Sequence, residues 1–105
     1  ATIILEVEHF GIKDSIVKNL GLVVNELYVN TIKYTPYGYD LNIRIKAFKK
    51  GSRVFFEYED NSPGYSNAKS GYGTEFIKET LEKLEDVKIK IDTNKKIHYQ
   101  VDFHI

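Results

Sequence analysis

The segment Asn25–Thr35, which reads NELYVNTIKYT, lies at the end of a longer pattern that is typical of an amphipathic helix. Apolar side chains recur three or four residues apart along this pattern, as they do on the buried face of a helix. They are Ile16, Leu20, Val23, Val24 and Leu27, and Thr31 continues the series. Asp14 or Ser15 can cap the start, and Pro36 ends the helix. The sequence therefore predicts one long helix over residues 14–34.

A polar edge runs beside the apolar face of this helix. At 100° per residue, Glu26, Asn30 and Lys33 fall within about 60° of each other. An amide oxygen is a ligand for Mg²⁺, an ammonium group neutralises phosphate, and a carboxylate can orient or deprotonate a hydroxyl. The trio therefore suits a magnesium nucleotide, although such a polar edge on an arbitrary helix is more often only solvated.

Alternating apolar and polar residues predict strands on both sides of this helix. The strands are expected at residues 2–8, 41–48, 53–59, 87–92 and 97–105, and a second helix at residues 74–85. The order is strand, helix, hairpin, loop, helix, hairpin. It predicts an α/β chain of the α+β two-layer sandwich type, with helices on one face of a mixed five-stranded sheet.

Two short motifs lie in and beside the loop that precedes the second helix. Asp60 follows a hydrophobic strand where the chain turns sharply, so its carboxylate can accept a hydrogen bond from an adenine amino group or simply initiate a turn. Gly71, Tyr72 and Gly73 open the second helix, where unpaired N–H groups favour an anion. The alternative for these three residues is a flexible entry into the helix.

Composition restricts the class of protein. The 105 residues are 42% hydrophobic, which predicts one domain with a modest core. Fifteen basic residues balance fifteen acidic ones, so no overall field attracts nucleic acid or an anionic membrane. The absence of cysteine excludes thiolate catalysis and disulfides. No apolar run approaches the roughly 18 residues that span a bilayer, so we expect a cytoplasmic domain without membrane contact.

Together, the three motifs resemble those of a known family. NELYVNTIKYT is similar to the N box of the GHKL ATPases, DNSPG to their first glycine box and GYG to their second. The motifs follow the family's order across nearly the whole chain. The N-box wording is most similar to the ATP-binding catalytic domain of sensor histidine kinases. The resemblance implies the Bergerat fold, with ATP and Mg²⁺ as ligands.

The resemblance also implies roles for residues of the first two motifs. Asn30 would coordinate Mg²⁺, and Glu26 would occupy the place of the catalytic base or water-positioning group. Lys33 and Tyr34 would approach the phosphates and the ribose. Asp60 would recognise the 6-amino group of adenine.

Further nucleotide contacts are implied around the two glycine boxes. Gly64 would let the base lie against the backbone. Gly71 and Gly73, with Tyr72 between them, would line the phosphate path below the ATP lid. Thr74 would add a hydroxyl on the same path.

Three functions fit the resemblance. The first is the catalytic domain of a sensor histidine kinase, comprising residues 1–105 as a single domain. The chain, which has no methionine, would be either a domain excised from a larger kinase or a protein whose initiator was removed. It would donate the γ-phosphate to a histidine on a separate dimerisation domain, which serves a response regulator, and would turn over little ATP alone. The second is an anti-sigma-type serine kinase, in which Glu26 activates a serine on a sigma-factor or anti-anti-sigma partner. The third is a GHKL-like interaction module with weak or lost ATP binding.

Several departures from the family's pattern keep the third function open. Ser62 stands where the family usually has glycine, and serine would be strained if the position required a positive φ. Only residues 65–70 separate the two glycine boxes, which predicts a short ATP lid. Glu75 lies in the first turn of the second helix, where its carboxylate would repel a triphosphate. The family's Gly-Thr pair before the last strand is also missing.

Overall fold

The computed structural model describes residues 2–63, 72–93 and 96–105, and the side chains of the second helix from Glu75 onward. Within these residues the chain forms five strands and two helices. In chain order they are β1 (Thr2–Val7), α1 (Asp14–Tyr34), β2 (Asn42–Lys50), β3 (Arg53–Asp60), α2 (Tyr72–Glu82), β4 (Lys88–Asp92) and β5 (Ile97–His104).

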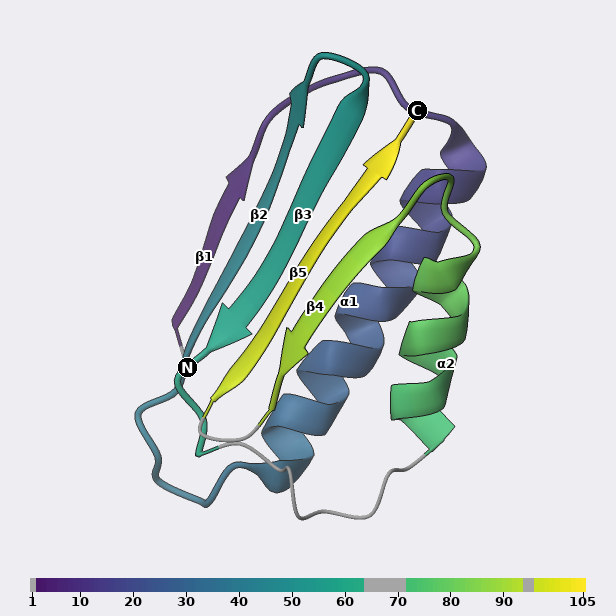
Figure 1. Ribbon diagram of the computed structural model, residues 1–105. Helices are drawn as coiled ribbons and strands as arrows, with labels where there is room; N and C mark the ends of the chain where they lie inside the picture. Colours follow the sequence, from purple (N-terminus) through teal and green to yellow (C-terminus); the bar gives the residue numbers. More distant parts are fainter. Residues whose placement is uncertain (1, 64–71, 94–95) are drawn as a thin grey trace.

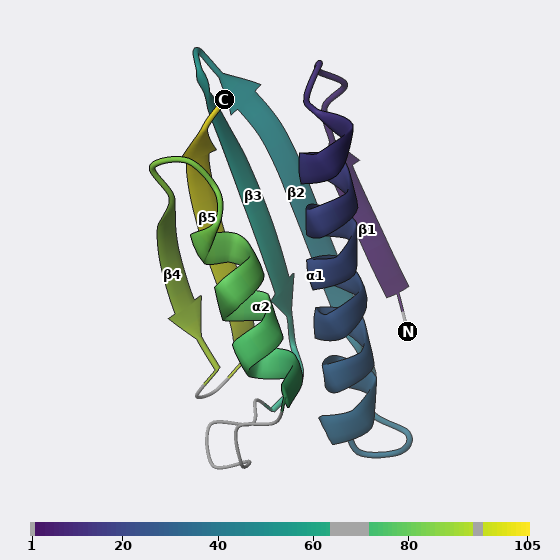
Figure 2. The ribbon, with the colours of Figure 1, turned by 90° about the vertical axis from the view of Figure 1, so that its right-hand side faces the viewer.

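The described strands form one mixed sheet in the order β1-β2-β3-β5-β4. β1 pairs with β2 in parallel, and the remaining neighbours are antiparallel. The strands run side by side in Figure 1, and both helices lie on one face of the sheet in Figure 2. The predicted two-layer α+β sandwich is therefore confirmed.

The core lies between the two layers and follows from the alternation of the central strands. Every second residue of β3 and β5 is buried, so that Tyr58 lies opposite Tyr99 and Phe56 opposite Val101. Each helix adds buried side chains at helical spacing; they are Val23 and Leu27 of α1 and Ile77 and Leu81 of α2. Complete burial of one such side chain stabilises the fold by roughly 1.5–3 kcal/mol.

The turn between β2 and β3 depends on glycine. Gly51 has a φ of 61°, a left-handed conformation that other residues adopt at a steric cost. The tight turn fixes the register of the hairpin, in which Lys50 pairs with Arg53 and Ile43 with Asp60. Asp60 is therefore placed at the last paired position of β3, on the buried face.

The alternation of Ile3, Leu5 and Val7 along the first strand predicts a half-buried strand, and this prediction is wrong. All six residues of this strand are exposed, including Ile3 at 49%, Leu5 at 65% and Val7 at 60%. Pairing with Ile43, Ile45 and Ala47 directs these three side chains to the helix side of the sheet. Among the described residues, however, the core includes both helices and the other strands but no residue of β1. β1 is an edge strand that the helix layer does not cover.

The ends of the helices also differ from the prediction. The N-cap of α1 is Lys13, without a side-chain hydrogen bond, and neither Asp14 nor Ser15 caps the helix. The first turn closes through the main-chain carbonyl of Lys13, which accepts from the N–H groups of the third and fourth residues after it. α2 begins at Tyr72, two residues before the predicted start, and ends at Glu82, three residues before the predicted end.

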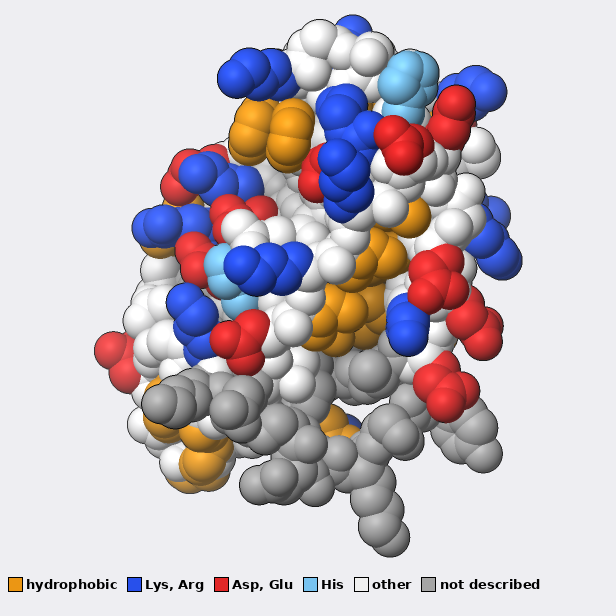
Figure 3. All heavy atoms as spheres, in the orientation of Figure 1, with side chains coloured by type: hydrophobic (Ala, Val, Ile, Leu, Met, Phe, Trp, Pro, Cys, Tyr) orange, Lys and Arg blue, Asp and Glu red, His pale blue; other side chains and the backbone are white. Residues whose placement is uncertain are grey.

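The other face of the sheet is polar. Figure 3 shows charged side chains of both signs spread over this side of the molecule. Arg53 donates to Asp102 on β5 from Nε at 2.9 Å and to Asp86 from Nη1 at 2.9 Å. Such a face is typical of a sheet that packs on one side only. Among the residues that the structure describes, no helix has the length and apolarity needed to cross a membrane.

Candidate functional site

A buried polar cluster joins α1 to the end of β3. The hydroxyl of Thr31 donates to Asp60 Oδ2 at 2.7 Å and lies 3.0 Å from the hydroxyl of Tyr58. Thr31 and Tyr58 are fully buried, and Asp60 is 5% exposed. The cluster fixes the carboxyl-terminal half of α1, which carries Asn30, against the strand end that carries Asp60.

The two hydroxyl groups of this cluster donate in sequence towards Asp60. Thr31 has one hydroxyl proton, and Asp60 Oδ2 accepts it, so the hydroxyl of Tyr58 donates to Thr31 Oγ1. Burial raises the pKa of Tyr58 above its ordinary value, so the phenol stays neutral and keeps its proton at neutral pH. Two successive hydroxyl protons therefore point towards the Asp60 carboxylate.

Asp60 keeps capacity to accept hydrogen bonds from a ligand. Its Oδ1 accepts the main-chain N–H of Ser62 at 2.9 Å, and its Oδ2 accepts the hydroxyl of Thr31. An ionised carboxylate offers about four acceptor positions, so two remain. A fixed acceptor of this kind suits an amino group of a bound base.

Asn61 fixes the chain immediately after Asp60. Its side-chain Nδ2 donates to the carbonyl of Asp40 at 2.9 Å, and its Oδ1 accepts the N–H of Asn42 at 2.6 Å. The hydroxyl of Tyr39 donates to its main-chain carbonyl at 2.5 Å. The α1–β2 connection thus holds the turn that starts the first glycine box.

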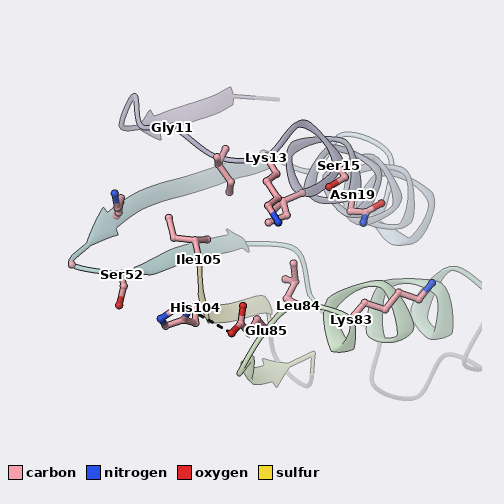
Figure 4. A pocket seen from close by; sticks show the side chains of 14 residues that line it. Gly11, Lys13, Ser15, Asn19, Ser52, Lys83, Leu84, Glu85, His104 and Ile105 are labelled. Carbon is pink, nitrogen blue, oxygen red and sulfur yellow. Dashed lines mark ion pairs between the residues drawn. The ribbon is translucent and has the colours of Figure 1, made fainter.

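Glu26 and Asn30 lie on one line along α1. Both are half-buried, and neither has a side-chain hydrogen bond within the described part of the chain. Asn19 precedes them by seven and eleven residues, which is the spacing of one helix stripe. Asn19 lines a cavity with Leu84, which follows α2, and Figure 4 shows the two on facing sides. The stripe therefore runs along the side of α1 that faces α2.

The other predicted residues of α1 lie nearer to solvent. Lys33 is exposed and Tyr34 is 36% exposed. The Lys33 ammonium lies 5.5 Å from the centre of the Tyr34 ring, which is within the range of a cation–π contact. Both residues lie at the end of α1, beyond the turn that carries Asn30.

The beginning of α2 is at the same end of the molecule as these groups. Figures 1 and 2 both show the start of α2, the carboxyl-terminal end of α1 and the end of β3 at the same end of the molecule. Tyr72, Gly73 and Thr74 form the first residues of α2. Gly64 and Gly71, together with the predicted lid at residues 65–70, lie outside the described residues. The described site residues therefore lie in the carboxyl-terminal half of α1, at the end of β3 and at the start of α2, and the side chains of residues 72–74 are not described.

These residues fit a magnesium nucleotide. Within the described ranges, no group of three histidine, cysteine or carboxylate residues could hold a metal ion alone. Mg²⁺ usually keeps several waters and binds through one or two protein ligands plus the phosphates of its substrate. An amide such as that of Asn30, with no hydrogen bond inside the described chain, meets that requirement.

A separate cavity of about 890 Å³ lies at the opposite end of α1. Lys13, Ser15, Gly51 and His104 are among its lining residues, so it opens beside the helix start and the β2–β3 turn. Asn19 is its lining residue nearest to Asp60 along α1, and the helix from Asn19 to Thr31, which contacts Asp60, is about 18 Å long. The cavity is not part of the predicted nucleotide site.

Three residues of the site were not identified from the sequence. The sequence assigns Thr31 only to the apolar face of its helix, Tyr58 only to a strand, and Asn61 only to a loop. A polar residue on an apolar face signals a buried hydrogen bond, because an unpaired polar group would be costly there. Thr31 on α1 and Asp60 on β3 both carried that signal.

Comparison with known proteins places this fold among solved structures. No family model matches the chain, and no curated protein matches its sequence. The histidine kinase domain of the Erythrobacter litoralis blue-light activated histidine kinase superposes with a TM-score of 0.80 and 10% identity, over 98% of this chain and 51% of that one. Acinetobacter baumannii histidine kinase AdeS superposes with a TM-score of 0.75 and 16% identity, over 98% and 53%.

A third structure, the mycobacterial sensor histidine kinase MprB, superposes with a TM-score of 0.71 and 15% identity, over 98% of this chain and 80% of that one. The chain thus spans about half the length, or less, of the first structures that it matches. At this identity the likeness establishes the fold. It is the fold of the histidine kinase catalytic domains that the chain matches, as the sequence predicted.

Proposed function

We infer that the chain binds magnesium ATP as the catalytic domain of a histidine kinase and supplies the γ-phosphoryl group to a histidine on a separate domain. The observation that carries this proposal is Asp60, a buried carboxylate held by Thr31 and Ser62 with acceptor capacity left over. The same helix turn that anchors it carries Asn30. The fold shared with histidine kinase catalytic domains supports the assignment.

Each end of the nucleotide has a candidate partner in the described residues. Asp60 accepts a hydrogen bond from the 6-amino group of adenine, and the amide oxygen of Asn30 contributes a ligand to Mg²⁺. The metal, when bound, neutralises the phosphates. Glu26, one helix turn before Asn30, orients the attacking group or accepts its proton.

The remaining contacts involve the ends of the two helices. Lys33 neutralises phosphate charge, and Tyr34 packs near the ribose. The first turn of α2, with Tyr72, Gly73 and Thr74, offers main-chain N–H groups to the phosphates. Gly64 and Gly71 complete the path.

Nucleotide binding is tested by titrating the chain with magnesium ADP, followed by calorimetry and by amide chemical shifts. We expect saturable binding with shifts in the amides of Asn30 and Asn61, because both flank the proposed contacts. An absence of heat and of shifts at millimolar nucleotide would leave the chain as an interaction module.

The location proposed with this function is the cytoplasm.

The identity of the phosphoacceptor residue is tested by the acid stability of the phosphorylated product. When the chain is incubated with labelled ATP and a histidine phosphoacceptor domain that passes phosphate to a response regulator, we expect an acid-labile label on the acceptor. An acid-stable label on a serine of a sigma-factor regulator would instead support the serine kinase. Because the chain spans only part of the structures that it matches, the acceptor domain must be supplied separately.

A further inference from the structure

The hydroxyl of Ser62 is buried without a partner. Ser62 is 3% exposed, and its Oγ makes no hydrogen bond within the part of the chain that the structure describes. Most buried side-chain polar atoms in proteins are paired, because an unpaired one loses its hydrogen bonds to water without replacement. The hydroxyl of Ser62 is therefore a group whose partner is to be sought outside the described chain.

The main chain at Ser62 is held in place on both sides. Its own N–H donates to Asp60 Oδ1 at 2.9 Å, and the N–H of the preceding Asn61 donates to the carbonyl of Asn42 at 3.2 Å. Among the described residues, Asp86 is the one non-glycine residue with a positive φ, so Ser62 does not adopt the conformation that would strain a serine. These hydrogen bonds fix the main chain that carries the hydroxyl, so the hydroxyl moves mainly by rotation about the Cα–Cβ bond of Ser62.

Ser62 and Asp60 together present a defined hydrogen-bonding pattern. Asp60, as a carboxylate, can only accept further hydrogen bonds, whereas the hydroxyl of Ser62 can donate one. Ser62 Oγ is three bonds from the N–H that contacts Asp60, so both groups can reach the same edge of a small ring. The complementary ligand has an amino group beside an unprotonated ring nitrogen.

We propose that Ser62 reads the base of the bound nucleotide by donating its hydroxyl proton to N1 of adenine, beside the 6-amino group that Asp60 accepts. The inference rests on the proposed nucleotide binding. Adenine has a donor at position 6 and an acceptor at N1, which matches the pair. Guanine and hypoxanthine have an acceptor at position 6 and a donor at N1, so both positions meet the wrong partner. The serine thus makes the site selective for adenine.

The test compares ADP with 1-deaza-ADP, in which a C–H replaces N1, on the wild type and on Ser62→Ala. One hydrogen bond corresponds to about a threefold to tenfold loss of affinity. We expect that loss for Ser62→Ala with ADP and for the wild type with 1-deaza-ADP. With 1-deaza-ADP the two proteins should bind equally, because the shared contact is already lost. Ser52→Ala, in the β2–β3 turn, is the control and should bind ADP as the wild type does.

Three outcomes would overturn the role of Ser62. The first is equal ADP affinity of Ser62→Ala and the wild type. The second is that the change from ADP to 1-deaza-ADP weakens binding to Ser62→Ala as much as it weakens binding to the wild type. N1 would then be bound by another group. The third is a lower Tm of free Ser62→Ala, since a hydroxyl without a partner contributes no stability; we expect an unchanged or higher Tm. In each case ADP binding by the wild type would leave the proposed function standing, whereas failure of the wild type to bind ADP would remove both.

Discussion

Thr31 in α1 and Asp60 at the end of β3 are joined by a buried hydrogen bond of 2.7 Å across 29 residues of sequence. Thr31 follows Asn30, and Asp60 precedes the first glycine box. A single contact therefore sets the distance between the residue proposed to bind the metal and the residue proposed to bind the base. The same contact has a structural role, because it satisfies a buried carboxylate.

The Thr31→Val substitution keeps the shape of the side chain and removes its hydroxyl. It leaves both the Tyr58 hydroxyl and Asp60 Oδ2 without their partner, so we expect a loss of about 1–3 kcal/mol in the free energy of unfolding, measured in urea. The matched control is Thr80→Val, because Thr80 is also a buried threonine but lies in α2. Equal losses at the two positions would show that the Thr31–Asp60 contact has no special weight.

The Tyr58→Phe substitution tests whether the Tyr58 phenol is buried and neutral, by comparing how the free energy of unfolding depends on pH. Burial raises the folded-state pKa of Tyr58, so above pH ~10 the unfolded chain loses this proton while the folded chain keeps it. Folding then becomes less favourable as pH rises, by up to about 1.4 kcal/mol per pH unit from this group. We expect the stability of the wild type to fall more steeply than that of Tyr58→Phe above pH ~10. Parallel stability profiles for the two proteins would contradict the burial of an ionisable phenol.

Two leucine substitutions test the difference between β1 and the core. Leu27 is fully buried, so Leu27→Ala should cost about 2–5 kcal/mol in the free energy of unfolding. Leu5 is 65% exposed on the edge strand, so Leu5→Ala should cost less than about 1 kcal/mol. Both are measured by denaturant unfolding. A cost at Leu5 close to that at Leu27 would mean that β1 is covered.

The long helix and the central hairpin could be predicted because their patterns are strong. α1 repeats apolar residues over several turns, and β3 alternates without interruption up to Asp60. The exposure of β1 could not be predicted in this way. Alternation shows that one side of a strand is apolar, but it does not show whether a second layer extends far enough to cover it.

The candidate site was predicted only in part. The spacing of Glu26 and Asn30 fixes their common stripe within one helix, so it can be obtained locally. The bond from Thr31 to Asp60 joins two elements that are distant in sequence, and each residue alone signals only that it needs a partner. Asn61 carried no signal, since asparagine is frequent in turns and its hydrogen bonds to residues 40 and 42 depend on the folded α1–β2 connection.

Glu26→Gln separates binding from catalysis. The substitution removes the charge and keeps the size, so we expect ADP affinity within about threefold of the wild type. Phosphoryl transfer to the histidine domain should fall about 10²-fold or more, as for the loss of a general base. Glu79→Gln, on the exposed side of α2, should transfer at the wild-type rate. Transfer by Glu26→Gln at the wild-type rate would exclude a catalytic role for Glu26.

The most direct test of magnesium-nucleotide binding compares Asn30→Ala with Asn25→Ala. Both substitutions remove one amide from the same helix, but Asn25 is exposed and lies about 140° away around the axis. ADP affinity is measured by calorimetry with Mg²⁺ and with EDTA. We predict that Mg²⁺ strengthens binding to the wild type and to Asn25→Ala by about tenfold or more, and that Asn30→Ala loses this gain. An undiminished gain in Asn30→Ala, or no ADP binding by the wild type, would contradict the account.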